Sequence, residues 1–146
     1  MKLNLGCSSN LRAGFVNVDI VPPCDECVDL CFNWPWPTSS IDYILAIDII
    51  EHLPDKRHTM NEIWRVLQPE GIAEIEVPTT NGECAWADPT HVSFWNRASF
   101  NYYLKDHELR RYAEPYRINA CFEVVEEYTR TMRDGPKLLI KLRAVK

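Results

Sequence analysis

Residues 41–78, IDYILAIDIIEHLPDKRHTMNEIWRVLQPEGIAEIEVP, decide the fold of this 146-residue chain. The segment Ile41–Ile47 is almost entirely apolar or aromatic, which is typical of a parallel strand that is covered on both faces. Residues 72–77 again carry mostly apolar side chains, among them Ile72, Ile75 and Val77, and have strand character. We therefore expect two buried strands of one sheet, joined by the residues between them.

The connection between these strands has the apolar period of a helix. Its apolar residues fall at positions i, i+3, i+4 and i+7, so they form one face that packs against the sheet. Pro69-Glu70-Gly71 ends the helix, and the whole segment is predicted to be a βαβ unit. The apolar face consists of Met60, Ile63, Trp64 and Leu67, and the charged residues expected in solvent are Lys56, Arg57 and Glu62.

Polar side chains follow the first of these strands directly. Asp48 ends the strand, and Glu51 and His52 come next. In open α/β sheets, ligands bind in the crevice at the carboxyl ends of the strands. The sequence therefore predicts a binding site at this edge of the sheet.

These segments closely resemble the class I S-adenosylmethionine (SAM) dependent methyltransferase family, in its small form similar to methyltransferase type 11. Asp42, the Glu51-His52-Leu53 segment and the helix end RVLQPEG at residues 65–71 occur in the order that the family has. Residues 2–7 (KLNLGC) look like the family's first strand and cofactor loop, and residues 17–19 (NVD) look like its second strand. The resemblance covers about residues 2–80.

The resemblance implies an α/β fold with a doubly wound, mostly parallel Rossmann-like sheet, built as one domain over residues 1–146. Only about ten residues separate Leu5 from Phe15, which is near the lower limit for a parallel crossover. The first helix is therefore expected to be shortened or missing.

The carboxyl-terminal third has its own pattern. Residues 98–112 are predicted to form a helix with a break near Lys105-Asp106. Residues 122–132 and 137–145 have strand character and flank the turn Asp134-Gly135-Pro136. We expect these two strands to form an antiparallel hairpin that closes the sheet.

The same resemblance implies that the chain binds SAM. Asp19, at the end of the second strand, would accept hydrogen bonds from the ribose hydroxyls, and Asp29 and Leu30 would contact the adenine. The methionine end would lie on the loop that starts at Gly6, with Asp48 and His52 closing the pocket. The cofactor-binding residues predicted in this way are Asn4, Gly6, Cys7, Asp19, Ile20, Asp29, Leu30, Asp48 and His52.

The predicted cofactor loop, residues 6–10 (GCSSN), keeps only the first of the glycines that are typical of the family. Without a first helix, it also offers fewer backbone amides to the methionine end of SAM. Two functions therefore stay open. The first is a SAM-dependent methyltransferase that acts on a small-molecule or sugar-like acceptor. The second is a catalytically inactive methyltransferase-like module that binds SAM, a nucleotide or a protein partner.

His91 is the candidate general base for methyl transfer. It follows a strand end and lies near Asp88 in the sequence, and imidazole takes up a proton near neutral pH. The alternative is that His91 hydrogen-bonds to Asp88 and holds this loop in place. Trp86, Phe94 and Trp95 in the same region either stack on a planar or sugar acceptor or cover the edge of the sheet.

The chain has six cysteines, and Cys24, Cys27 and Cys31 lie close together in the sequence. A CxxC pair can hold zinc, but a structural zinc site needs four ligands. Because the sequence has no second CxxC and no HxxxH, free thiols are the default and we assign no metal ligands. A small zinc-dependent interaction domain stays open as a third hypothesis.

Composition limits the classes of partner. The net charge of −5 argues against sequence-independent nucleic-acid binding, which needs clustered Lys and Arg. The chain has no apolar run of 18 residues, and its amino terminus has strand character, so we expect no membrane association and a cytoplasmic location. The sequence assigns neither the atom that is methylated nor an oligomeric state.

Overall fold

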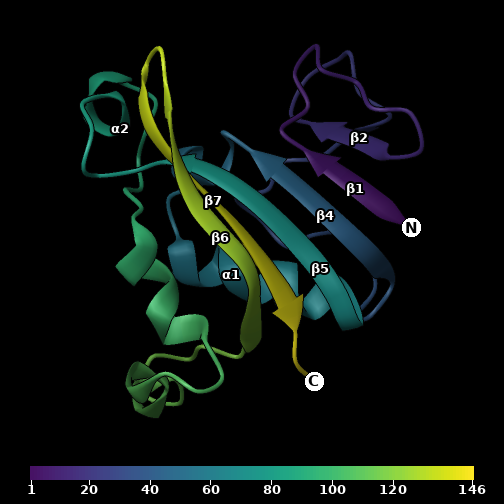
Figure 1. Cartoon of the computed structure of the whole chain (residues 1–146). Helices are drawn as coiled ribbons and strands as arrows, with labels where there is room; N and C mark the ends of the chain where they lie inside the picture. Colours follow the sequence, from purple (N-terminus) through teal and green to yellow (C-terminus); the bar gives the residue numbers. More distant parts are fainter.

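The strands predicted from residues 41–78 lie at the centre of a seven-stranded sheet in the computed structural model, which describes residues 1–146 (Figure 1). The strand order is β3-β2-β1-β4-β5-β7-β6. Neighbours among β1 to β5 are parallel, whereas β7 is antiparallel to β5 and to β6. This confirms the mostly parallel sheet with a carboxyl-terminal antiparallel hairpin. The strands are β1 (Lys2–Leu5), β2 (Val16–Asp19), β3 (Glu26–Cys27), β4 (Ile41–Ile47), β5 (Leu67–Pro78), β6 (Phe122–Met132) and β7 (Gly135–Ala144).

Helices are few and mostly short. The predicted crossover helix is α1 (Lys56–Val66), and the Asp55 side chain caps it by accepting a hydrogen bond from His58 N at 3.0 Å. The region 98–112 forms two 3₁₀ helices in place of the predicted helix, with the break at Lys105-Asp106 where it was expected. The remaining helices are η1 (Ile50–His52), α2 (Cys84–Ala87), η2 (Arg97–Tyr103) and η3 (Glu108–Tyr112).

The connection from β1 to β2 contains no helix, as the short spacing predicted. Two buried asparagines hold this loop: Asn4 Nδ2 donates hydrogen bonds to Asn17 Oδ1 (2.9 Å) and to Asn10 O (3.0 Å). Arg12 N donates to the same Asn17 oxygen at 2.8 Å. Side-chain amides therefore organise the loop where a helix would otherwise order the backbone. No helix crosses the front face of the sheet in Figure 1, whereas α1 lies behind it.

The apolar face of α1 packs against the back of the sheet as its period predicted. Met60 and Ile63 are completely buried, as is Leu67, which follows the last residue of α1 and begins β5. Trp64 is only partly buried, at the margin of this core, where its indole Nε1 donates a hydrogen bond to Val145 O at 2.8 Å. The helix phase is therefore confirmed, but Trp64 ties the carboxyl terminus to α1 and is not the centre of the core.

Glu62 is buried, although the helix pattern predicted it in solvent. Its carboxylate accepts hydrogen bonds from Trp34 N (2.9 Å) and from the Arg65 guanidinium (2.7 Å). Arg65 in turn donates to the carbonyl oxygens of Trp34 (3.1 Å) and Trp36 (2.9 Å). The segment between β3 and β4 covers this side of α1. The Glu62–Arg65 pair on the outer face of the helix holds that segment through hydrogen bonds to its backbone.

We expect Glu62→Ala to destabilise the protein by about 2–3 kcal/mol, because it leaves the Arg65 charge without its carboxylate partner and Trp34 N without its acceptor. The value lies below that of a fully buried pair because the Arg65 side chain is 30% exposed. Urea unfolding followed by tryptophan fluorescence measures the difference. Glu126→Ala, which removes an exposed glutamate from β6, is the control and should change stability by less than about 1 kcal/mol. Equal effects of the two substitutions would contradict the buried network.

Candidate functional site

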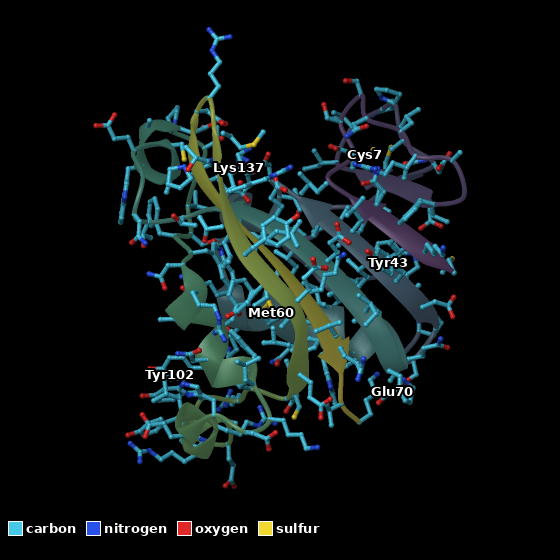
Figure 2. The ribbon with its side chains drawn as sticks, in the orientation of Figure 1. Cys7, Tyr43, Met60, Glu70, Tyr102 and Lys137 are labelled. Atoms are coloured by element: carbon cyan, nitrogen blue, oxygen red, sulfur yellow. The ribbon has the colours of Figure 1, made fainter.

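The carboxyl ends of β1, β2 and β4 meet at one edge of the sheet because these strands are parallel neighbours. Figure 2 shows Cys7, just after β1, and Lys137, at the start of antiparallel β7, at this edge, while Glu70 lies at the opposite end of the sheet. Two adjoining hollows lie along the carboxyl edge.

The first hollow, the Asp19 pocket, has a volume of about 160 Å³. Six of the nine residues predicted to bind the cofactor line it: Gly6, Asp19, Ile20, Asp29, Leu30 and His52. The Asp19 carboxylate accepts hydrogen bonds from Ser8 N and Ile20 N, both at 2.7 Å. A carboxylate has about four lone-pair sites, so these two bonds leave capacity for ligand hydroxyls.

Gly6 is the one glycine of the cofactor loop, and the structure requires it there. Its φ of +63° is in the left-handed region, and a Cβ at this position would lie 2.7 Å from Ile49 Cβ. Ser8, with φ +45°, shows that the next left-handed position of the loop tolerates a side chain. The loop therefore keeps a glycine where the backbone approaches Ile49, which also lines the Asp19 pocket.

We expect Gly6→Ala to cost about 1–2 kcal/mol in backbone strain and an additional amount for the clash with Ile49. Gly14→Ala is the matched control, because Gly14 has φ +79° but nothing within 4 Å of the position of a Cβ. The difference between the two free energies of unfolding, measured in urea, isolates the contact with Ile49. If both substitutions cost the same, the close approach at Gly6 is wrong.

Two of the predicted cofactor residues lie beneath the loop and do not line the pocket. Asn4 is buried, and its side-chain amide donates hydrogen bonds to Asn17 and Asn10. Cys7 is buried with its Sγ 3.6 Å from Pro23 O, and burial together with the Asp19 carboxylate raises the pKa of its thiol. Both residues therefore support the shape of the loop from behind.

The second hollow, the Glu51 cleft, has a volume of about 480 Å³. Asp48, also predicted to contact the cofactor, lines this cleft and not the Asp19 pocket. The buried Lys137 Nζ donates to Asp48 Oδ2 at 2.6 Å and lies 3.5 Å from Asp134 Oδ2. His52 lines both hollows, so the cleft and the pocket adjoin at this residue.

His91 lines the Glu51 cleft with its side chain only 8% exposed. Its Nδ1 lies 3.0 Å from Ala85 O, and because a carbonyl oxygen only accepts, Nδ1 carries the proton in this contact. The other ring nitrogen, Nε2, lies 3.9 Å from Glu51 Oε1 and 3.8 Å from Asp88 Oδ2. The contact with Ala85 holds the loop and leaves Nε2 as the ring nitrogen that faces the two carboxylates.

Glu51 is a site residue that the sequence reasoning left out of its predicted set. It is 2% exposed, and neither of its carboxylate oxygens has a hydrogen-bond partner. Burial, with a smaller contribution from the Asp48 and Asp88 carboxylates, raises the pKa of Glu51 to about 7. Its position in the polar segment that follows β4, next to His52, is the feature of the sequence that could have identified it.

The cysteines do not assemble the ligand set that a zinc domain would need. The neighbouring Cys27 thiol raises the pKa of Cys24 to about 11, while Cys31 lines the Asp19 pocket. The only His, Cys, Asp or Glu residues that come together as three are Glu51, His52 and His91, with one ligand atom of each within 4.8 Å of the others.

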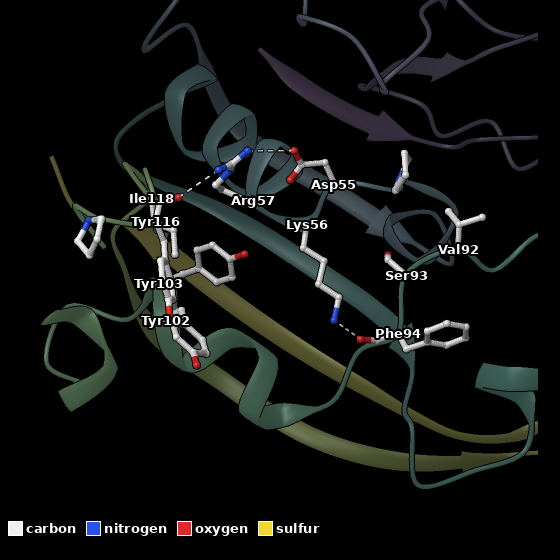
Figure 3. A pocket seen from close by; sticks show the side chains of 12 residues that line it. Asp55, Lys56, Arg57, Val92, Ser93, Phe94, Tyr102, Tyr103, Tyr116 and Ile118 are labelled. Atoms are coloured by element: carbon white, nitrogen blue, oxygen red, sulfur yellow. Dashed lines mark hydrogen bonds and ion pairs between the residues drawn. The ribbon is translucent and has the colours of Figure 1, made fainter. Parts of the chain in front are cut away.

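The largest cavity, about 920 Å³, lies elsewhere, and we call it the Tyr102 groove (Figure 3). It runs between the start of α1 and the aromatic residues Tyr102 and Tyr103. Phe94 lines it, but none of the predicted cofactor-binding residues does, and neither does His91. Inside it, Lys56 Nζ donates to Phe94 O, as the dashed line in Figure 3 marks. Volume alone therefore does not identify the site, and the convergence of polar groups favours the carboxyl edge.

Comparison with known proteins gives one family. The family model described as a methyltransferase domain matches residues 8–115. No curated protein sequence matches the chain significantly. None of its helices is long and apolar enough to cross a membrane.

Many solved structures share the fold. A chain in the complex between the Haloferax volcanii Trm112 methyltransferase activator and a methyltransferase has a TM-score of 0.68 at 16% identity, over 99% of this chain and 82% of that one. The N-methyltransferase NodS from Bradyrhizobium japonicum has a TM-score of 0.63 at 15% identity, over 99% and 85%. The 1,6-didemethyltoxoflavin-N1-methyltransferase of Burkholderia thailandensis was crystallised with S-adenosylhomocysteine. It has a TM-score of 0.66 at 14% identity, over 99% of this chain and 71% of that one.

Proposed function

Because this chain belongs to the methyltransferase domain family, we propose that it transfers a methyl group from SAM to a small-molecule or sugar-like acceptor. The observation that carries the proposal is the Asp19 pocket, which gathers six residues predicted to bind the cofactor. The adjoining Glu51 cleft supplies a place for the acceptor, with His52 shared between the two. Methyl transfer is an in-line displacement, so donor and acceptor must lie in neighbouring sites that align them.

In this proposal, Asp19 accepts hydrogen bonds from the ribose, and the Asp29–Leu30 segment contacts the adenine. The pocket is smaller than the roughly 300–1,000 Å³ of typical sites for drug-sized ligands. The pocket therefore takes only part of SAM: in this proposal the nucleoside lies in it, and the methionine part extends past His52 toward the larger cleft. This arrangement directs the methyl group of SAM at the acceptor.

His91 is the proposed base for the acceptor's proton. With its Nδ1–H on Ala85 O, the neutral ring presents the Nε2 lone pair on the cleft side. An acceptor hydroxyl or amine in the cleft would then donate to Nε2 as its oxygen or nitrogen attacks the methyl carbon. The folds of NodS and of the toxoflavin N1-methyltransferase support a small-molecule acceptor.

A catalytically inactive module is the second candidate. It is favoured by one observation, the loop after β1, which has no helix whose amino-terminal amides would bind the methionine carboxylate. A panel of acceptors incubated with methyl-labelled SAM separates the two functions. SAM binding without transfer to any acceptor would favour the module.

Replacing Asp19 tests the cofactor site. We expect Asp19→Ala to weaken SAM binding at least tenfold, because charge-assisted hydrogen bonds to the ribose are worth about 1.5–3 kcal/mol each. Asp19→Asn keeps one acceptor oxygen and should give a smaller loss. Asp42→Asn, near the amino-terminal end of β4 and away from the pocket, is the control and should bind SAM like the original protein. Unchanged affinity in Asp19→Ala would rule out the assigned pocket.

A further inference from the structure

We propose that Glu51, His52 and His91 bind a divalent transition metal ion, for which zinc is the best fit. The three residues converge from η1 and from the loop after α2, and one ligand atom of each lies within 4.8 Å of the others. The proposal goes beyond methyl transfer, which needs no metal. Glu51 and His52 are adjacent, but His91 lies about forty residues later in the sequence, so no local motif contains all three ligands.

The first argument is an excess of buried acceptors. Both Glu51 oxygens are buried without a hydrogen-bond partner, and His91 Nε2, the ring nitrogen that does not contact Ala85 O, lies 3.9 Å from Glu51 Oε1. Asp48 Oδ1 beside them is also buried and unpartnered. A buried carboxylate that lacks donors is costly unless a cation pairs with it. The site is therefore incomplete without a positive group.

The second argument is the way the two histidines are held. His91 Nδ1 lies 3.0 Å from Ala85 O, and His52 Nδ1 lies 3.1 Å from Thr90 O. Each carbonyl fixes a proton on Nδ1 and leaves Nε2 as a lone pair. Metal-binding histidines typically donate their second ring N–H to a carbonyl or a carboxylate in this manner. Both imidazoles are therefore set in the tautomer that a metal requires.

The third argument is charge. Asp48, Glu51, Asp88 and Asp134 line the cleft together with one lysine, Lys137. Lys137 is already paired with Asp48 at 2.6 Å and with Asp134 at 3.5 Å, so its single positive charge is shared among four carboxylates. A cleft with such an excess of carboxylates attracts a cation.

The donor set selects the ion. Two imidazole nitrogens with one carboxylate suit zinc and related transition metals, whereas magnesium prefers oxygen ligands and retained water. Ligand atoms about 2.0–2.2 Å from a tetrahedral zinc lie roughly 3.4 Å from one another. His91 Nε2 and Glu51 Oε1 are 3.9 Å apart, and all three ligand atoms lie within 4.8 Å of one another, so side-chain rotations have to bring each pair closer by at most about 1.4 Å. Three protein ligands leave one position open.

The open position gives the ion a role that rests on the proposed function. An acceptor hydroxyl on the ion would lose its proton to water more readily, because a bound metal lowers the pKa of its oxygen ligand. The oxygen would then bond to the methyl carbon as the sulfur–carbon bond breaks, leaving S-adenosylhomocysteine. In the protein with the ion bound, His91 acts on the acceptor through the metal and not directly as a base. The acceptors that this site favours are then hydroxyl compounds.

Calorimetry with zinc alone tests the site. The full chain, stripped with a chelator, carries Cys24→Ser and Cys27→Ser so that the thiol pair does not bind the metal. We expect one ion per chain. Glu51→Gln and His91→Gln should each weaken zinc binding by more than the roughly 10–100-fold typical of losing an outer-shell partner. Glu126→Gln on β6 and His107→Gln, both outside the cluster, are the matched controls and should leave the affinity unchanged.

The absorption spectrum of bound cobalt(II) identifies the types of ligand at the site. Cobalt(II) at this site should show visible ligand-field bands without an intense near-ultraviolet thiolate band. A thiolate band, an absence of zinc binding, or zinc affinity that survives both Glu51→Gln and His91→Gln would each overturn the proposal. SAM binding is measured separately in the metal-free protein. Its absence there would overturn the proposed function and leave the metal result intact.

Discussion

His91→Ala should slow the methyl-transfer step by about 10²–10⁴-fold while leaving SAM affinity nearly unchanged. The reason is that His91 Nε2, directly as a base or through the ion that it would bind, acts on the acceptor's proton only on the way to the transition state. Single-turnover transfer from bound SAM to a saturating acceptor measures the step. His107→Ala, which removes a histidine at the start of η3, is the control and should react at the original rate.

The alternative role of His91 gives a different result. If its contact with Ala85 O only holds the loop, His91→Ala should weaken acceptor and SAM binding together, with a modest change in the chemical step at saturation. A chemical rate identical to that of the original protein would exclude His91 both as a base and as a ligand of a catalytic metal.

Trp95→Ala should destabilise the protein by about 3–5 kcal/mol. Trp95 is completely buried, packs on Phe100 with ring centroids 5.2 Å apart, and donates from Nε1 to Ser93 Oγ at 2.9 Å. The substitution leaves a cavity between η2 and the sheet and removes the hydrogen bond that Ser93 Oγ accepts, while Ser93 Oγ still donates to Ile50 O. Urea unfolding measures the loss.

Trp86→Ala is the matched control, because Trp86 lies in the same region but is 58% exposed. It stacks on Phe94 with ring centroids 4.3 Å apart, so we expect a loss of only about 0.5–1.5 kcal/mol. Similar losses in the two variants would contradict this division. The sequence left open whether these aromatics cover the sheet or stack on an acceptor; burial assigns Trp95 to the core and leaves the Trp86–Phe94 pair accessible.

The fold was predictable where side-chain period reports the packing directly. The face of α1 that carries Met60 and Ile63 follows from helix geometry, and the hairpin β6–β7 follows from the turn at Gly135. The position of Glu62 was not predictable in this way. Its cover comes from Trp34, 28 residues earlier, and a helical period contains no information about such a distant segment.

The candidate site divides along the same line. Gly6 and Asp19 end neighbouring parallel strands, so the topology alone brings them to one edge. Glu51 and His91 meet only because the loop after β5 folds back over η1, where Glu51 O accepts hydrogen bonds from Val92 N (2.9 Å) and Ser93 N (3.0 Å). That path depends on contacts between two irregular segments, which local sequence patterns do not specify.

Binding of S-adenosylhomocysteine, followed residue by residue by NMR on this 17.0 kDa chain, tests the central claim most directly. We predict saturable binding of one molecule per chain, with the largest amide shift changes at Gly6, Ile20, Leu30 and His52. Shift changes confined to the Tyr102 groove, or no shift changes at any concentration of the ligand, would contradict the placement of the cofactor in the Asp19 pocket.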